Sequence, residues 1–213
     1  MSSVTRKHQS TRAQRRDEMR RRLLEVVERL LDEGESFTEV SVERLVSEAG
    51  ISRSTFYVYF EDKGDLLHAW FGDITAEIAD AAQDWWSLGP DVTYEAVREA
   101  LDKVVKAYWP HTTLMAATYD AAAYDPSLRE LVESMMNLNA ASLRKHIRKS
   151  QDGGFVDPHL LPAQTSAWLT WMAERGLHQM VRTAAPAELE RLIDAYAGIV
   201  WNTLYAPTRR VVV

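Results

Sequence analysis

Apolar residues recur at spacings of three and four along almost the whole chain, and this helical period most constrains the fold. Within residues 12–33 they share one stripe of a helix: Leu23, Val26, Val27, Leu30 and Leu31. No segment alternates apolar and polar residues over a useful length, so a β-strand would lack a partner. The sequence therefore predicts an all-α fold.

Proline and glycine interrupt the pattern, for example at Gly34, Gly50 and Pro126, and divide the chain into nine expected helices. The stretch 52–60 is rich in β-branched and aromatic residues, but we interpret it as a helix because a strand there would be unpaired. The expected helices span residues 12–33, 41–49, 52–60, 63–86, 93–108, 111–123, 126–151, 162–183 and 187–205.

The composition changes near residue 63, after which all seven tryptophans and five of the seven methionines occur. Aromatic and methionine side chains are typical of a large core or of an adaptable apolar pocket. We expect four segments: a flexible basic arm at 1–15, a compact three-helix unit at 16–62, a larger helical lobe at 63–206 and a frayed C-terminus at 207–213.

Charge is distributed unevenly. Residues 1–22 hold eight Lys or Arg against two acidic residues, although the whole chain has a formal net charge of −6. A basic terminus on an acidic body indicates contact with a polyanion, most commonly nucleic acid. The same pattern fits a solubilising or disordered tail.

The sequence lacks the residues or motifs that several classes of protein function require. There are no cysteines, which excludes disulfides, thiolate metal sites and thiol nucleophiles. No apolar run approaches the roughly 18 residues of a membrane span, so we expect a cytoplasmic protein that does not enter a membrane. Glu174 and His178 have a spacing that suits two metal ligands, but a surface contact or a pocket lining is commoner. The six histidines form no catalytic motif, and we expect no enzyme activity, metal or cofactor.

Residues 41–60 carry the clearest functional pattern. A short helix, a turn at Gly50 and a second short helix capped by Ser52 have the spacing of a helix-turn-helix, whose second helix presents its first residues to base edges. Arg53 can donate two hydrogen bonds to guanine, and tyrosine hydroxyls suit phosphate oxygens. We expect Phe56 and Phe60 to face the core. The predicted DNA contacts are Ser41, Arg44, Ser52, Arg53, Ser54, Thr55, Tyr57, Tyr59 and Lys63.

This segment resembles the signature of TetR-family transcriptional repressors, in the run Val42-x-x-Leu45-Val46-x-x-Ala49-Gly50-Ile51-Ser52-x-Ser54-Thr55-Phe56-Tyr57-x-Tyr59-Phe60-x-x-Lys63-x-x-Leu66. The resemblance implies that 16–62 is a helix-turn-helix DNA-binding domain and that 63–206 binds a ligand and dimerises. It also implies that Lys63 and the Ser41 hydroxyl contact phosphate. Glu43 departs from the basic residue of some members, and it accepts from cytosine or favours the helix dipole.

The larger lobe resembles the actinobacterial ethionamide-resistance-type branch of the family, through Trp171 to Arg175, although Ala173 replaces a polar amide residue. A pocket there implies an effector that is largely apolar, elongated or aromatic, with one or two polar anchors. Glu174 and Arg175 form an internal ion pair, a ligand anchor or a surface pair. The candidate pocket residues, which the core could equally use, are Trp109, Met115, Tyr119, Tyr124, Met135, Asn139, Trp168, Trp171, Met172 and Arg175.

The last expected helix is apolar over more than half its circumference, more than one intramolecular face requires. With the family resemblance, this favours a homodimer through the last two helices, in which the interface residues are Leu189, Leu192, Tyr196, Ile199, Val200 and Thr203.

The sequence thus predicts a ligand-responsive transcriptional regulator. We favour a repressor over an activator: a homodimer on a near-palindromic operator of double-stranded DNA, released by a small apolar or aromatic effector. The alternative is a helical small-molecule sensor or binding protein without sequence-specific DNA recognition.

Overall fold

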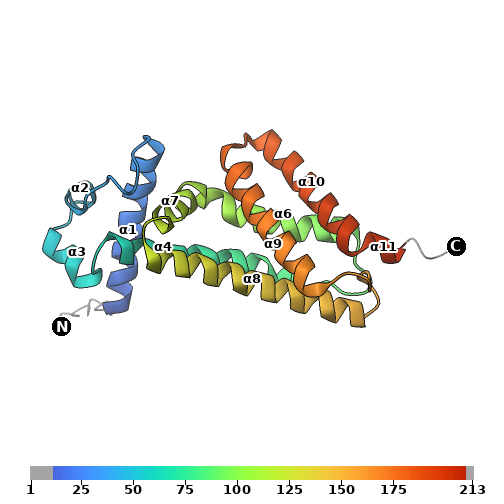
Figure 1. The fold of residues 1–213 in the computed structure, drawn as a ribbon. Helices are drawn as coiled ribbons and strands as arrows, with labels where there is room; N and C mark the ends of the chain where they lie inside the picture. Colours follow the sequence, from blue (N-terminus) through green and yellow to red (C-terminus); the bar gives the residue numbers. More distant parts are fainter. Residues whose placement is uncertain (1–11, 210–213) are drawn as a thin grey trace, which may run out of the picture. The chain divides into compact units, whose positions relative to one another are not determined.

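The computed structural model describes residues 12–209, and within them every regular element is a helix, which confirms the all-α prediction (Figure 1). The chain forms two compact units, one up to Trp70 and one from Phe71 onward, whereas the sequence places the boundary between residues 62 and 63. None of the helices within residues 12–209 combines the length and apolar character that a membrane crossing requires.

The two predicted terminal segments can be compared with the structure only over their described residues, which are helical. Of the basic arm predicted at 1–15, residues 1–11 lie outside the described range, and residues 12–15 belong to the first helix. Of the frayed end predicted at 207–213, residues up to Arg209 form the short helix α11, Ala206–Arg209, and the rest lie outside the described range.

The amino-terminal unit contains α1 (Arg12–Asp32), α2 (Val42–Glu48), α3 (Arg53–Tyr59) and the start of α4 (Lys63–Ala81). Phe56 and Phe60 of the third-helix segment are buried, as the sequence predicts. Burying each such side chain stabilises the fold by about 1.5–3 kcal/mol. The indole of Trp70 donates to the carbonyl of Arg20 at 3.0 Å, which ties α4 to α1. The buried apolar side chains around them are Leu23, Val27, Leu30, Leu45 and Leu66.

The turn between α2 and α3 has a defined hydrogen-bond pattern. Gly50 has a φ of +61°, a conformation that side chains with a Cβ rarely adopt. Its N–H donates to Ser47 O at 3.1 Å, and the N–H of Ile51 donates to Val46 O at 2.9 Å, which is the Schellman arrangement that ends a helix. Ser52 then caps α3, because its hydroxyl accepts from the N–H of Thr55 at 3.0 Å.

In the carboxyl-terminal unit, α6 packs beside α10, α8 beside α9, and α7 against α8 (Figure 1). The helices are α5 (Gln83–Ser87), α6 (Tyr94–Tyr108), α7 (Thr112–Ala122), α8 (Pro126–Asp152), α9 (Pro162–Gln179) and α10 (Pro186–Leu204), with 3₁₀ turns at Trp109–His111 and Val181–Thr183. Each predicted helix is present.

Two predicted helices are interrupted. The helix predicted at 63–86 breaks at Ala82, where the Gln83 side chain donates to Ala79 O at 3.2 Å and so satisfies a carbonyl at the end of α4. The helix predicted at 162–183 ends at Gln179, and the chain continues as the 3₁₀ turn before Pro186.

Three aromatic side chains form a buried polar cluster in this unit. The Trp85 indole donates to the Tyr205 hydroxyl at 3.0 Å, and that hydroxyl lies 2.8 Å from His146 Nε2. A neutral imidazole can accept a hydrogen bond from the Tyr205 hydroxyl, so each of the three groups has a partner of the right kind. Burial, followed by the charge of Lys149, lowers the pKa of His146 to about 4.

We predict that His146 makes the protein less stable in mild acid. The unfolded imidazole titrates near a pKa of about 6.5, so below that pH the unfolded state binds the proton more strongly. The free energy of unfolding falls as the pH drops from about 6.5 to 4, by on the order of 3 kcal/mol. Urea unfolding at a series of pH values, followed by tryptophan fluorescence, measures this change in the free energy of unfolding.

His146→Gln removes this loss, and His159→Gln, a change at an exposed histidine, retains it. A wild-type protein and a His146→Gln variant with the same pH dependence of stability would contradict the prediction.

Candidate nucleic-acid interface and candidate pocket

The first turn of α3 presents polar side chains to solvent. Ser52, Arg53 and Ser54 are exposed, Thr55 is half-buried, and the three hydroxyl groups lie together, with Ser52 Oγ 2.8 Å from Ser54 Oγ and 2.7 Å from Thr55 Oγ1. Tyr57 is also exposed, one turn further on. This arrangement has the donors and acceptors that base edges and phosphates require.

Arg53 is held by two neighbours. Its guanidinium is paired with the Glu43 carboxylate of α2 and lies 5.6 Å from the centroid of the Tyr57 ring. Both charged side chains are more than half exposed, so the ion pair is accessible to solvent and contributes little stability. The sequence analysis assigned Glu43 a contact with cytosine or with the helix dipole. In the structure Glu43 pairs with Arg53, the side chain that we expect to read a base.

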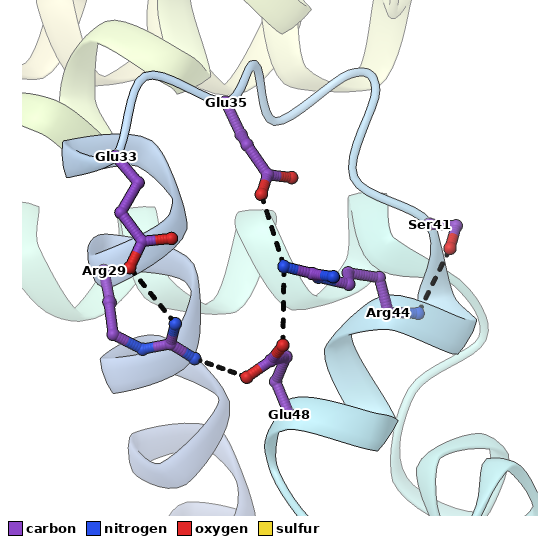
Figure 2. Close-up of polar contacts among 6 residues, drawn as sticks. All are labelled: Arg29, Glu33, Glu35, Ser41, Arg44 and Glu48. Atoms are coloured by element: carbon purple, nitrogen blue, oxygen red, sulfur yellow. Dashed lines mark hydrogen bonds and ion pairs between the residues drawn. The ribbon is translucent and has the colours of Figure 1, made fainter.

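Ser41 and Arg44, two of the predicted DNA contacts, make contacts within the amino-terminal unit. Ser41 caps α2 by accepting from the N–H of Arg44 at 3.1 Å. Figure 2 shows the Arg44 guanidinium between two carboxylates, 3.5 Å from Glu35 and 3.4 Å from Glu48. Glu48 also accepts from Arg29 of α1 at 2.7 Å. These contacts join α1, α2 and the loop between them. The last predicted contact, Tyr59, is half-buried.

Lys63 is placed differently from the sequence-based assignment. Its ammonium donates to three carbonyls of the loop before α2, at 2.9 Å to Phe37, 2.7 Å to Thr38 and 3.0 Å to Val40. An ammonium has three N–H donors, and all three are engaged, so none is available for a phosphate in this conformation. Burial lowers the pKa of Lys63. In this conformation Lys63 fixes the loop that precedes α2, and its phosphate contact stays a prediction.

We predict that Lys63→Met destabilises the amino-terminal unit. The variant keeps the aliphatic stem but leaves the carbonyls of Phe37, Thr38 and Val40 without their donor, at a cost of about 1–3 kcal/mol. Chemical denaturation measures the change, and hydrogen exchange locates it in the loop. Arg21→Met, which removes one positive charge from an exposed position of α1, serves as the control and leaves the stability nearly unchanged. Equal effects from both substitutions would contradict the role of Lys63.

A cavity of about 180 Å³ lies in the carboxyl-terminal unit, with walls from α4 to α10. Four of the predicted pocket residues line it: Met115, Tyr119, Met135 and Asn139. The other six lie elsewhere. Tyr124 is exposed after α7, Trp109 is in a 3₁₀ turn, and Met172 packs against the core. Trp168, Trp171 and Arg175 are exposed on α9.

The face of α9 explains this correction. Trp168, Trp171 and Arg175 share an outer stripe, whereas the cavity-lining residues of α9 occupy another stripe: Leu169, Thr170, Ala173, Glu174 and Leu177. The spacings of three and four between these residues could have identified the cavity-facing side of α9 from the sequence. The sequence analysis instead chose the tryptophans, on the basis of residue type. Further wall residues that the sequence analysis did not assign to the pocket include Trp85, Trp86, Tyr108, Ser142 and Tyr196.

The α9 wall contributes the acidic group of the cavity. The Glu174 side chain is 9% exposed, and its Oε2 accepts no hydrogen bond from residues 12–209. Burial raises the pKa of Glu174. Burial, and then the charge of Glu174, raise the pKa of both Tyr108 and Tyr119. The carboxylate and the two phenols therefore form one polar region in an apolar cavity. Within the described range, no group of three or more potential ligands could hold a metal ion.

The outer faces of α9 and α10 carry exposed apolar side chains. Trp168 is 78% exposed, Trp171 52% and Ile199 47%. Of the predicted interface residues, Ile199 is exposed, and Leu192 and Thr203 are half-buried. Leu189 and Val200 are instead buried in the core, and Tyr196 lines the cavity, because this side of α10 faces the interior of its own subunit.

The arrangement of α2, the Gly50 turn and α3 is that of a helix-turn-helix DNA-binding domain. Residues 26–70 match the family described as bacterial regulatory proteins of the tetR family. Two similar proteins are named HTH-type transcriptional regulator EthR. The one from Mycolicibacterium smegmatis is 26% identical over 89% of this chain and 87% of its own, and the one from Mycobacterium tuberculosis H37Rv is 27% identical over 88% and 87%.

Solved structures share the fold. The TetR-family regulator PfmR from Thermus thermophilus superposes with a TM-score of 0.69 at 16% identity, over 86% of this chain and 98% of that one. A TetR-family protein from Mesorhizobium loti gives a TM-score of 0.66 at 16% identity, over 92% and 100%. The match over residues 26–70 and these relatives agree with the resemblance seen in the sequence: the chain carries a tetR-family amino-terminal domain and is similar to TetR-family transcriptional regulators over most of its length.

Proposed function

We propose that the protein is a ligand-responsive repressor that binds a near-palindromic operator as a homodimer. The observation that carries this proposal is the exposed polar first turn of α3, held after the Gly50 turn within the segment that matches the family. In this proposal Arg53, Ser54, Thr55 and Tyr57 read bases or nearby phosphates. The chain then acts without catalysing a reaction, in keeping with relatives named as regulators.

The homodimer interface in this proposal is the exposed apolar surface of α9 and α10, centred on Trp168, Trp171 and Ile199. Exposed tryptophans are unfavourable in water and are characteristic of interface hot spots. Two copies related by a two-fold axis would form a four-helix bundle. The two α3 helices then enter major grooves about 34–36 Å apart.

An effector acts, in this proposal, by preferring one separation of the two α3 helices. The cavity is the proposed site, and α4 is the proposed lever because Lys63 begins it and Ile78 lines the cavity near its end. Only a ligand with different affinities for the two conformations can shift the equilibrium between them. The similarity to proteins named EthR supports placing the chain near that branch of the family.

We predict that DNA selected from a random pool by the full-length protein contains a two-fold symmetric sequence. Arg53→Ala relaxes the preference at one base pair of each half-site by about 1–3 kcal/mol, because a bidentate contact with guanine is lost. Arg148→Ala removes the same charge from an exposed site on α8 and leaves the preference unchanged. Quantitative gel retardation with single-base variants measures both. Uniform binding to all pool sequences would instead favour a helical sensor without sequence-specific recognition.

We predict that Trp168→Glu weakens the dimer. A charge in the buried centre of the interface lacks a partner there, which raises the dissociation constant by about 30-fold or more. Sedimentation velocity over a range of concentrations measures the change. Tyr124→Glu is the control, because Tyr124 is 86% exposed and lies outside α9 and α10. A Trp168→Glu protein that dimerises as well as the control would place the interface elsewhere.

A further inference from the structure

The cavity wall contains a hydrogen-bond acceptor that the described residues leave unsatisfied. Glu174 Oε2 is buried, and no donor within residues 12–209 forms a hydrogen bond to it. Glu174 Oε2 forms an ion pair with Arg175, but the Arg175 Nε lies 3.7 Å away, beyond hydrogen-bond distance, and its side chain is 65% exposed. A buried carboxylate oxygen without a hydrogen-bond donor is costly, and the cost is recovered when a cation with N–H donors occupies the site.

The surroundings of Glu174 favour the same kind of ligand. The Tyr108 hydroxyl is buried and has no hydrogen-bond partner among the described residues, so a second polar group is available to a bound molecule. Trp85 and Trp86, whose rings stack at 4.7 Å, also line the cavity. Tryptophan and tyrosine faces attract cations and pack against apolar or aromatic groups.

The volume of the cavity limits the size of that ligand. At about 180 Å³ the cavity is smaller than most drug-sized sites. It is comparable with an apolar cavity of about 150 Å³ that admits benzene. One aromatic ring or a short branched alkyl group, with a polar group beside Glu174, fits this space.

Two exposed arginines oppose a cation only weakly. The charges of Arg175 and Arg182 act on the tyrosines of this region, lowering the pKa of Tyr119 and Tyr108 respectively, but burial and Glu174 outweigh them and both pKa values are raised. Solvent screens such exposed charges, whereas the carboxylate lies on the cavity wall. Among the charges that act on these two tyrosines, Glu174 therefore has the largest effect.

We infer that the cavity binds a compact aromatic or apolar molecule that carries a protonated amine, with Glu174 as its counter-ion and the surrounding aromatic rings as its walls. This inference rests on the proposed function in that the cavity is the effector site. It narrows the effector from an apolar molecule to an apolar amine.

The test compares three probes of similar length on the full-length protein without DNA: 2-phenylethylamine, 2-phenylethanol and 3-phenylpropanoate, by titration calorimetry at neutral pH. The amine binds about tenfold or more tightly than the neutral alcohol, because its contact with the carboxylate is charge-assisted, and the anion binds most weakly. Equal or tighter binding of the alcohol or the anion, or no binding of the amine, overturns the inference.

Glu174→Gln tests the assigned residue. It keeps the size of the side chain, and we expect it to bring the amine to the affinity of the alcohol while the alcohol binds as before. Glu133→Gln, the same charge change at an exposed site on α8, retains the preference. An amine preference that survives in Glu174→Gln also overturns the inference.

The wild-type comparison does not depend on how the variants fold. The selection of DNA from a random pool is a separate experiment, carried out on the ligand-free protein. Sequence-specific DNA binding without an amine preference therefore rejects this inference alone, whereas loss of specific DNA binding rejects the proposed function.

Discussion

The orientation of α3 depends on the turn at Gly50. A positive φ at this residue closes two hydrogen bonds back to α2 and directs the chain into the Ser52 cap within three residues. A Cβ at this position would also lie 3.1 Å from the Arg22 guanidinium of α1. The turn thus satisfies the end of one helix and the start of the next, and it leaves the first turn of α3 exposed while Phe56 enters the core.

The carboxyl-terminal unit uses its helices on more than one face. On α9, Glu174 and its neighbours line the cavity, while Trp168 and Trp171 point away from it. On α10, Val200 is buried in the core, Tyr196 lines the cavity, and Ile199 is exposed. In the proposed function, a ligand contact and a subunit contact on adjacent stripes of the same helices would give a short physical connection between effector binding and dimer geometry.

The sequence predicts helices well because their apolar periodicity and their caps are local. Ser41, Ser52 and Asp125 all cap helices that the pattern anticipates. It predicts sites less well, because residue type does not identify the face of a helix. Trp168 and Trp171 suggest a pocket by composition, yet their register puts them outside. Long-range partners, such as Glu43 for Arg53 and the loop carbonyls for Lys63, have no local signal in the sequence.

The ion pairs within the amino-terminal unit affect how DNA binding would depend on salt concentration. Arg29, Arg44 and Arg53 face carboxylates. In the proposed function, Arg44 and Arg53 exchange a protein carboxylate for a DNA contact. Such an exchange releases fewer condensed counterions than the neutralisation of a phosphate by a fully solvated arginine, because the freed carboxylate attracts cations again. In this proposal the ionic-strength dependence of DNA binding is shallower than the number of basic residues in the amino-terminal unit suggests.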